Sequence, residues 1–212
     1  MRATLRWVLW DVKDTLLKVR ASVGEQYCKE AERVGLNISP VEVEAAFRQA
    51  YRHHSSRYPN YGVSQGLDGR SWWVAVVRDT FSQCTVQDPA LLNAMAHNLY
   101  QNFCKAENWE VFPDSKKTLE TCSSLGLELG EAGIAKPNPA IFKQALQKCG
   151  VLAANVAHVG DHYVNDYLAS KSVGIHGLLL DRCNQHNTAS VPAEHRLRSL
   201  EELPSLLQQQ ML

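Results

Sequence analysis

Two short runs, each followed by an aspartate, constrain the fold of this chain more than any other sequence feature. Trp7 to Trp10 are four unbroken apolar residues that end directly at Asp11, and Val156-Ala-His-Val159 is followed, after one glycine, by Asp161. Runs of this length without regular alternation of apolar and polar residues are typical of strands buried on both faces, as in a parallel sheet. We therefore predict two buried strands that carry aspartates at their carboxyl ends.

Beyond Pro113 the sequence alternates between helical and strand patterns. Helices are predicted over 114–125, from Asn138-Pro139 to 149, and over 199–207, and strands are predicted to begin at Leu127, at Val156 and at Ile175. Alternation of this kind predicts an α/β fold with a doubly wound parallel sheet. Its ligand site is expected at the carboxyl ends of the strands.

The stretch from about residue 20 to about residue 108 has almost no strand signal and is predicted to form several helices. One helix is predicted to end at Gly35, and Ser39-Pro40-Val41-Glu42 predicts the start of the next, with a capping box between the serine and the glutamate. The segment 55–69 is rich in Ser, Gly, Asn and Tyr, which predicts a loop. We expect a helical domain, 18–108, inserted into a core domain formed by 1–17 and 109–212.

Four residues fall where the ligand site of such a sheet is expected. Asp11 and Asp161 follow strands, Asp166 comes five residues later, and Lys136 precedes a helix in Ala-Lys-Pro-Asn-Pro. Taken singly, each is more simply a turn, cap or solvated loop residue. Together, carboxylates at two strand ends of one sheet would converge with a lysine, and like charges that close need a cation. Hard carboxylate oxygens favour Mg²⁺, which keeps several waters and binds beside substrate phosphate.

Three motifs, in the same order, resemble those of the haloacid dehalogenase-like hydrolase superfamily. They are Trp10-Asp11-Val12-Lys13-Asp14-Thr15-Leu16, Lys136-Pro-Asn-Pro-Ala-Ile-Phe142 and His158-Val-Gly-Asp161-His-Tyr-Val-Asn-Asp166. The similarity runs over essentially the whole chain. It implies a Rossmann-like core, in which the inserted helical domain is the family's cap.

The resemblance also implies a role for each residue of the motifs. Asp11 would be the nucleophile that forms an aspartyl-phosphate intermediate. Asp161 and Asp166 would hold Mg²⁺, together with Asp11 and the backbone carbonyl of Lys13. Lys136 would neutralise Asp11 against the incoming phosphate.

The cap implied by the resemblance would close over the site, exclude water and choose the substrate. Tyr58, Tyr61 and Trp72 lie in or beside the predicted loop and are candidates to face the pocket. Aromatic residues in such places more often serve packing than ligand binding.

Lys13 stands where the family's phosphatases usually place a second aspartate, which protonates the leaving group. Lysine beside carboxylates is a poor general acid, because their negative charge raises its pKa, and Asp14 would point elsewhere. Dehalogenases of the family also lack this aspartate, but they do not generally carry the paired metal aspartates retained here as Asp161 and Asp166. The metal motif favours phosphate chemistry, and Lys13 favours a slow or specialised form of it.

A segment that the family's fold requires is missing between Gly130 and Glu131. The end of one strand, a helix, a further strand and their loops would occupy roughly 30 residues, together with the Ser or Thr of the family's second motif. Either the sequence skips residues or the chain is a deleted form; we favour a bonded deletion. In that case the Asp11 strand is expected to lose its neighbour on that side. Lys136 is then expected to lie beyond hydrogen-bond reach of Asp11.

Composition and apolar runs bear on the kinds of partner and on the cellular location. Lys plus Arg and Asp plus Glu both number 22, so net charge favours neither a nucleic-acid nor a membrane partner. The longest apolar run after the N-terminal one, Trp72 to Val77, is too short for a membrane span, and no targeting signal is found. The six single cysteines favour free thiols in a reducing environment. We expect an intracellular protein whose compartment, substrate and oligomeric state the sequence does not name.

Three functions follow in order of preference. The first is a Mg²⁺-dependent phosphohydrolase of a small phosphorylated metabolite, acting through Asp11. The second is a catalytically weak or inactive protein that keeps this fold and binds a ligand or partner, which Lys13 and the missing segment favour. The third is a dehalogenase.

Overall fold

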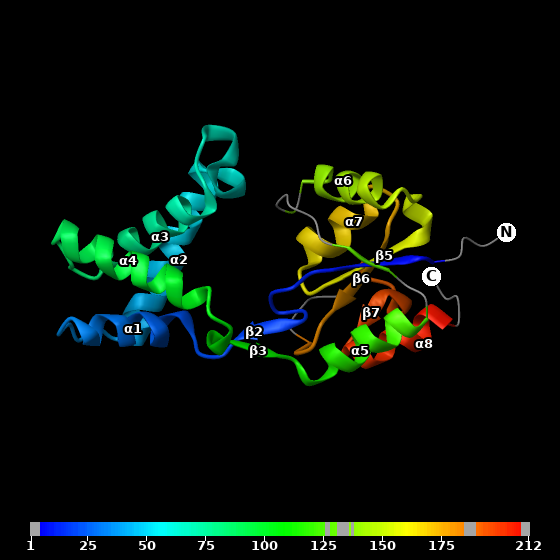
Figure 1. The fold of residues 1–212 in the computed structure, drawn as a ribbon, viewed down its shortest axis with the longest axis horizontal. Coiled ribbons are helices and arrows are strands. Elements are labelled where there is room, and N and C mark those ends of the chain that lie inside the picture. The colour runs from blue at the N-terminus through cyan, green and yellow to red at the C-terminus, as the bar shows by residue number, and fades with distance from the viewer. Residues whose placement is uncertain (1–4, 126–127, 131–135, 137, 185–189, 209–212) are drawn as a thin grey trace. The chain divides into compact units, whose positions relative to one another are not determined.

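The computed structural model describes residues 5–125, 128–130, 136, 138–184 and 190–208. The chain divides into two compact units, Met1–Lys18 with Val111–Leu212, and Val19–Glu110. The first is an α/β unit and the second is helical (Figure 1). We describe each by itself.

A parallel five-stranded sheet forms the centre of the α/β unit. Its strands are β1 (Trp7–Trp10), β4 (Glu128–Gly130), β5 (Val156–Gly160), β6 (His176–Leu180) and β7 (Arg196–Leu197), in the order β4-β1-β5-β6-β7. Every pairing is parallel, and Trp10 of β1 lies beside Val159 of β5. The expected α/β fold with a doubly wound parallel sheet is confirmed.

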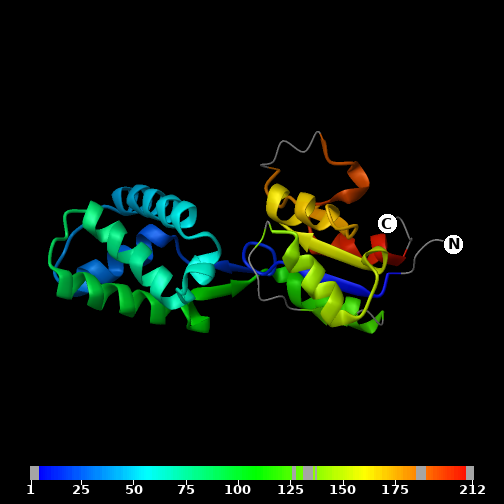
Figure 2. The ribbon, with the colours of Figure 1, turned by 90° about the horizontal axis from the view of Figure 1, so that it is seen from above.

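Helices cover both faces of this sheet (Figure 1; Figure 2 gives the view from above). One face carries α5 (Pro113–Ser124) and α8 (Leu203–Gln208), and the other carries α6 (Ala140–Cys149) and α7 (Ala169–Lys171). Side chains alternate along each strand, so Val8 packs with the first pair of helices and Leu9 with the second. Strands buried on both sides explain why their sequences are continuous apolar runs.

The helical unit contains four helices around one core. They are α1 (Val23–Arg33), α2 (Pro40–Arg57), α3 (Gly69–Gln83) and α4 (Pro89–Phe103). Tyr27, Phe81, Met95 and Leu99 are almost completely buried between them. Among the helices that the structure describes, none has the length and apolar character needed to cross a membrane.

Two local expectations in this unit need correction. Ser39 precedes α2, but its side chain makes no capping hydrogen bond; the capping box is instead at Ser22 and Glu25, before α1. The segment 55–69 is less open than expected, because α2 continues to Arg57 and a 3₁₀ segment follows over Pro59–Gln65. The prediction of a C-terminal glycine was correct, since Gly35 follows α1 with a φ of 78°.

Several short elements were not predicted. β2 (Leu17–Val19) and β3 (Trp109–Val111) form a two-stranded sheet where the chain passes between the units, and β7 has only two residues. Segments this short give no periodic pattern to detect. The described residues also include the short 3₁₀ and π helices η2 (Ala106–Asn108), η3 (Ala153–Asn155), η4 (Tyr163–Leu168), η6 (Ala193–His195) and η7 (Leu200–Glu202).

The sheet contradicts one expectation about the missing segment. β1 keeps a neighbour on the side away from β5, since Trp7, Val8 and Leu9 pair with residues 128–130 of β4. The expected loss of that neighbour is therefore wrong. Among the described residues, β4 is the edge of the sheet. The Gly130–Glu131 junction itself lies outside the described residues.

A largely buried ion pair joins α5 to the segment after β6. The guanidinium of Arg182 donates to both carboxylate oxygens of Asp114, at 2.7 and 2.9 Å, and to the backbone carbonyl of Thr15 at 2.9 Å. Asp114 also accepts from the Ser199 hydroxyl at 2.9 Å and from the Leu200 amide at 3.0 Å. Burial raises the pKa of Asp114, but these donors lower it more, so its pKa lies below the usual value.

We predict that Asp114→Asn lowers the free energy of unfolding by about 3 kcal/mol, because it leaves the Arg182 charge without its partner. The folded-state pKa of Asp114 is depressed, so its stabilisation is present above the unfolded pKa of about 3.9 and is lost as pH falls through the folded value. The difference from wild type should therefore hold at neutral pH and shrink in acid. Urea denaturation at several pH values measures it.

Glu120→Gln is the matched control, because Glu120 lies on the same helix in an exposed pair with Lys116. Exposed pairs of this kind contribute little, so no measurable change is expected. Equal effects of the two variants would contradict the importance given to the buried pair.

Candidate active site and metal centre

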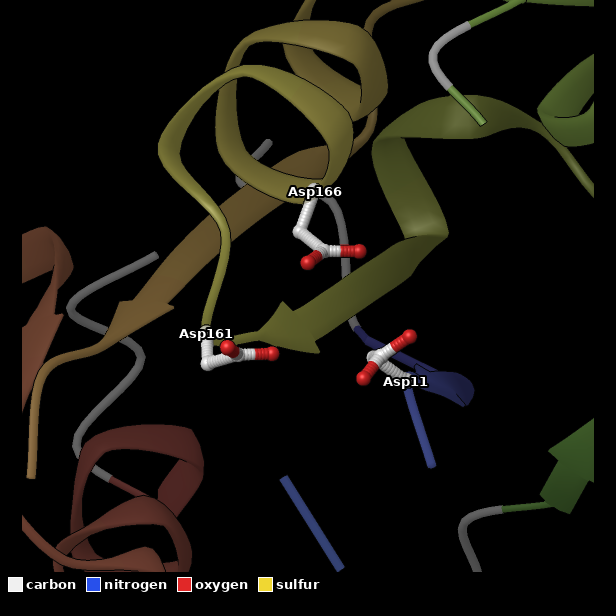
Figure 3. A group of neighbouring side chains, drawn as sticks. All are labelled: Asp11, Asp161 and Asp166. Carbon is white, nitrogen blue, oxygen red and sulfur yellow. The ribbon is translucent and has the colours of Figure 1, made fainter. Parts of the chain in front are cut away.

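Three aspartates converge at the carboxyl ends of neighbouring strands (Figure 3). Asp11 follows β1, and its amide continues the sheet by donating to the Val159 carbonyl at 2.9 Å. Asp161 follows β5, the strand beside β1, and Asp166 lies in the π-helical turn η4. One carboxylate oxygen from each lies within 4.8 Å of the others.

Asp166 is the most constrained of the three, with only 1% of its surface exposed. Its Oδ2 accepts the backbone amide of His162 at 3.0 Å. A side chain on Gly160 would collide with the Asp166 carboxylate, so the glycine at the end of β5 is needed for this close approach.

Lys136 contacts two of these aspartates. Its ammonium group donates to Oδ1 of Asp11 and to Oδ1 of Asp166. The expectation that Lys136 would be displaced from Asp11 is therefore wrong. The helix α6 begins four residues after Lys136 and packs on the sheet through Ile141 and Phe142, so this packing brings the lysine to the site.

The charges at the site shift one another's pKa values. Burial lowers the pKa of Lys136, but the negative charges of Asp166 and Asp11 raise it by more. The net pKa is therefore above the usual value, and the side chain is an ammonium. Burial raises the pKa of Asp166, yet hydrogen bonds and charge from His158 and Lys136 bring it down to about 2. The pKa of Asp161 is raised by burial and by the negative charges of Asp11 and Asp166. Among the described residues, the surroundings of Asp161 therefore disfavour its negative charge.

This charge imbalance fits a hard cation. One lysine faces three carboxylates, and oxygen ligands with the remaining positions filled by water are the set that Mg²⁺ takes in proteins. Asp11, Asp161 and Asp166 are the side chains that could hold it. The Lys13 carbonyl as a further ligand stays a prediction.

Two polar side chains of the site were not singled out from the sequence. His158 lies on β5 with its Nε2 3.0 Å from Asp166 Oδ1, and Thr15, fully buried, donates its hydroxyl to Asp161 Oδ1 at 3.3 Å. A histidine within an otherwise apolar buried strand was the signal for His158. Thr15 had no signal of its own.

Lys13 and Asp14 contact each other rather than the three aspartates. The Lys13 ammonium pairs with the Asp14 carboxylate, and their side chains are 63% and 47% exposed. Asp14 has a φ of 65°. It lies in a tight turn, where its backbone amide donates to the carbonyl oxygen of Leu17. It does not contribute to the trio of aspartates.

The candidate aromatic residues belong to the helical unit. Trp72 is 2% exposed and packs with Ala50 and Val76, while Tyr58 and Tyr61 lie against or beside this cluster. Trp72 thus has the packing role that the sequence favoured for such residues. A contact of Tyr58 or Tyr61 with a ligand stays a prediction.

Comparison with known proteins agrees with this geometry. The sequence model of the haloacid dehalogenase-like hydrolase family matches residues 124–174. Haloacid dehalogenase-like hydrolase domain-containing protein 3 of Danio rerio is 54% identical, with 98% of each chain covered. That alignment runs over 238 positions, 26 more than the 212 residues of this chain, so at least 26 positions of the relative have no counterpart here.

Solved structures share the fold at low sequence identity. The 2-haloacid dehalogenase of Pseudomonas syringae pv. Tomato DC3000 is 18% identical, with a TM-score of 0.66 over 97% of this chain and 99% of that one. The HAD phosphatase of Thermococcus onnurineus is 19% identical, with a TM-score of 0.59 over 96% and 98%. These likenesses show the fold, and the sequence match to the relative from Danio rerio shows the family. The chain belongs to the haloacid dehalogenase-like hydrolases.

Proposed function

We propose that this protein is a Mg²⁺-dependent phosphohydrolase of a small phosphorylated metabolite, and that Asp11 is its nucleophile. The observation that carries the proposal is the convergence of Asp11, Asp161 and Asp166 within 4.8 Å. A dehalogenase needs the nucleophile but does not generally carry the paired metal aspartates beside it. A phosphohydrolase would use all three, because together they would hold a Mg²⁺ ion that offsets the charge of the phosphate.

Asp11 would attack the phosphorus atom with one carboxylate oxygen, forming a P–O bond as the bond to the leaving alcohol breaks. Lys136 is already in contact with Asp11, and its positive charge offsets the repulsion between this carboxylate and the dianionic phosphate. When bound, Mg²⁺ would neutralise the phosphoryl oxygens and orient them for attack. Water would then hydrolyse the aspartyl-phosphate and release inorganic phosphate.

The leaving alcohol needs a proton, and no evident donor lies where the family's phosphatases place one. Lys13 occupies that position in the sequence but is mostly exposed and paired with Asp14. An ammonium held by a carboxylate is a weak acid. We therefore infer that aryl phosphates, whose leaving groups need no proton, turn over faster than alkyl phosphates.

A second candidate function is ligand binding without appreciable turnover. Lys13 is the specific observation that favours it, together with the positions of the relative that this chain lacks. A screen of phosphorylated metabolites with Mg²⁺ separates the two candidates. Saturable binding without phosphate release would favour the binding protein, and release would favour the enzyme.

We predict that Asp11→Asn abolishes Mg²⁺-dependent phosphate release, because the amide keeps the shape of the side chain but removes the attacking charge. Glu120→Gln is the control: it also replaces a carboxylate by an amide, but in an exposed pair with Lys116 on α5, outside the trio. Its activity should stay near that of wild type. Activity that survives Asp11→Asn would rule out the covalent mechanism.

We further predict that Lys13→Asp raises turnover of alkyl phosphates by about 10²–10⁴-fold, the usual contribution of general acid catalysis. The gain should be small for an aryl phosphate such as p-nitrophenyl phosphate. Parallel kcat measurements on both substrates test this. An equal change for both, or none, would mean that Lys13 has another task.

A further inference from the structure

His158 is a polar residue in an apolar place. It is the middle residue of β5 and is 3% exposed. Its ring lies 4.8 Å from that of Phe142 on α6, at an interplanar angle of 73°. An aromatic hydrocarbon would fill this space equally well, so packing alone does not explain a histidine here.

The hydrogen-bond partners of the His158 ring indicate which of its nitrogens carries a proton. Nε2 lies 3.0 Å from Oδ1 of Asp166, and an ionised carboxylate only accepts, so Nε2 carries the proton. Nδ1 is buried and has no partner among the described residues. The ring form that this geometry supports is therefore one that donates from Nε2 to Asp166.

In this form His158 fixes one oxygen of Asp166, and the backbone fixes the other. The His162 amide holds Oδ2 and the imidazole holds Oδ1, so the carboxylate is held from two sides, by the backbone before η4 and by a side chain of β5. Oδ1 is also the oxygen that Lys136 contacts. Without the imidazole, the long and flexible lysine would be the remaining side chain that orients Oδ1.

We propose that His158 is a positioning residue that sets the affinity of the three aspartates for a divalent cation by orienting Asp166. The inference rests on the proposed function, because it assumes that these aspartates bind a metal ion. It adds that His158, which is not itself a metal ligand, affects how tightly the metal ion binds. Hydrogen-bond partners of metal ligands typically contribute 10–100-fold to metal affinity.

The test is a Mn²⁺ titration followed by electron paramagnetic resonance, with Mg²⁺ competition, on the full chain. His158→Phe keeps the aromatic packing and removes the donor, and should weaken Mn²⁺ binding by about 10–100-fold. His158→Gln carries an amide N–H that reaches about as far as Nε2, and should restore most of the affinity. Unchanged affinity in His158→Phe, or no recovery in His158→Gln, would overturn the inference.

His176→Phe is the matched control. His176 lies on the neighbouring strand β6, and its Nε2 contacts the backbone carbonyl of Ala154 at 3.0 Å rather than an aspartate. The change of side chain is the same, but no ligand loses a partner. A loss of affinity equal to that of His158→Phe would mean that the effect comes from the strand, and would overturn the inference.

The ring form can be measured on the wild-type protein, which keeps the inference testable if a variant fails to fold. ¹⁵N shifts of the His158 ring should report a proton on Nε2, the nitrogen that faces Asp166. A proton on Nδ1 alone would overturn the inference. A wild-type protein that binds no Mn²⁺ or Mg²⁺ would overturn both this inference and the proposed function. Wild-type binding that His158→Phe leaves unchanged would overturn only the inference.

Discussion

The parallel pairing of β1 with β5 is the constraint on which the site depends. Because Trp10 lies beside Val159, the residues that follow the two strands emerge at the same edge of the sheet, and Asp11 meets Asp161 there. The turn after β5 brings Asp166 back to the same place, where Gly160 leaves room for it. The mutual repulsion of these carboxylates opposes folding, and Lys136 offsets part of it. The remaining excess charge is what suits the site to a cation.

Much of this arrangement could be predicted from the sequence, because it follows from local patterns. Two apolar runs predicted the central strands β1 and β5, and the aspartates after these runs indicated the candidate metal ligands. Features that depend on contacts with distant parts of the chain were harder to predict. The Ser39 and Glu42 pair has the right spacing for a capping box but does not form one, and β7 is too short to show any periodicity. His158 gave a signal, a polar residue in a buried strand, but its partner Asp166 lies eight residues away on another element.

The segment that we predict to be missing after Gly130 affects the site less than the sequence suggested. The alignment with the relative from Danio rerio supports an absence of this size, although it does not locate it. We expected its loss to separate Lys136 from Asp11, on the assumption that the missing strands carry the lysine to the site. The structure instead brings the lysine there from the α6 side, where Ile141 and Phe142 pack on the sheet. The helix after the lysine is sufficient to direct it.

The central claim is that Asp11 becomes phosphorylated during turnover. Trypsin cleaves after Arg6 and Lys13, and the resulting peptide, Trp7 to Lys13, contains Asp11 as its one acidic side chain. Borohydride added during turnover of a phosphate ester reduces an aspartyl-phosphate to homoserine, which mass spectrometry of this peptide detects. We expect homoserine at position 11 when both Mg²⁺ and the ester are present, and unmodified aspartate when either is left out. Phosphate release with position 11 unmodified throughout would contradict it.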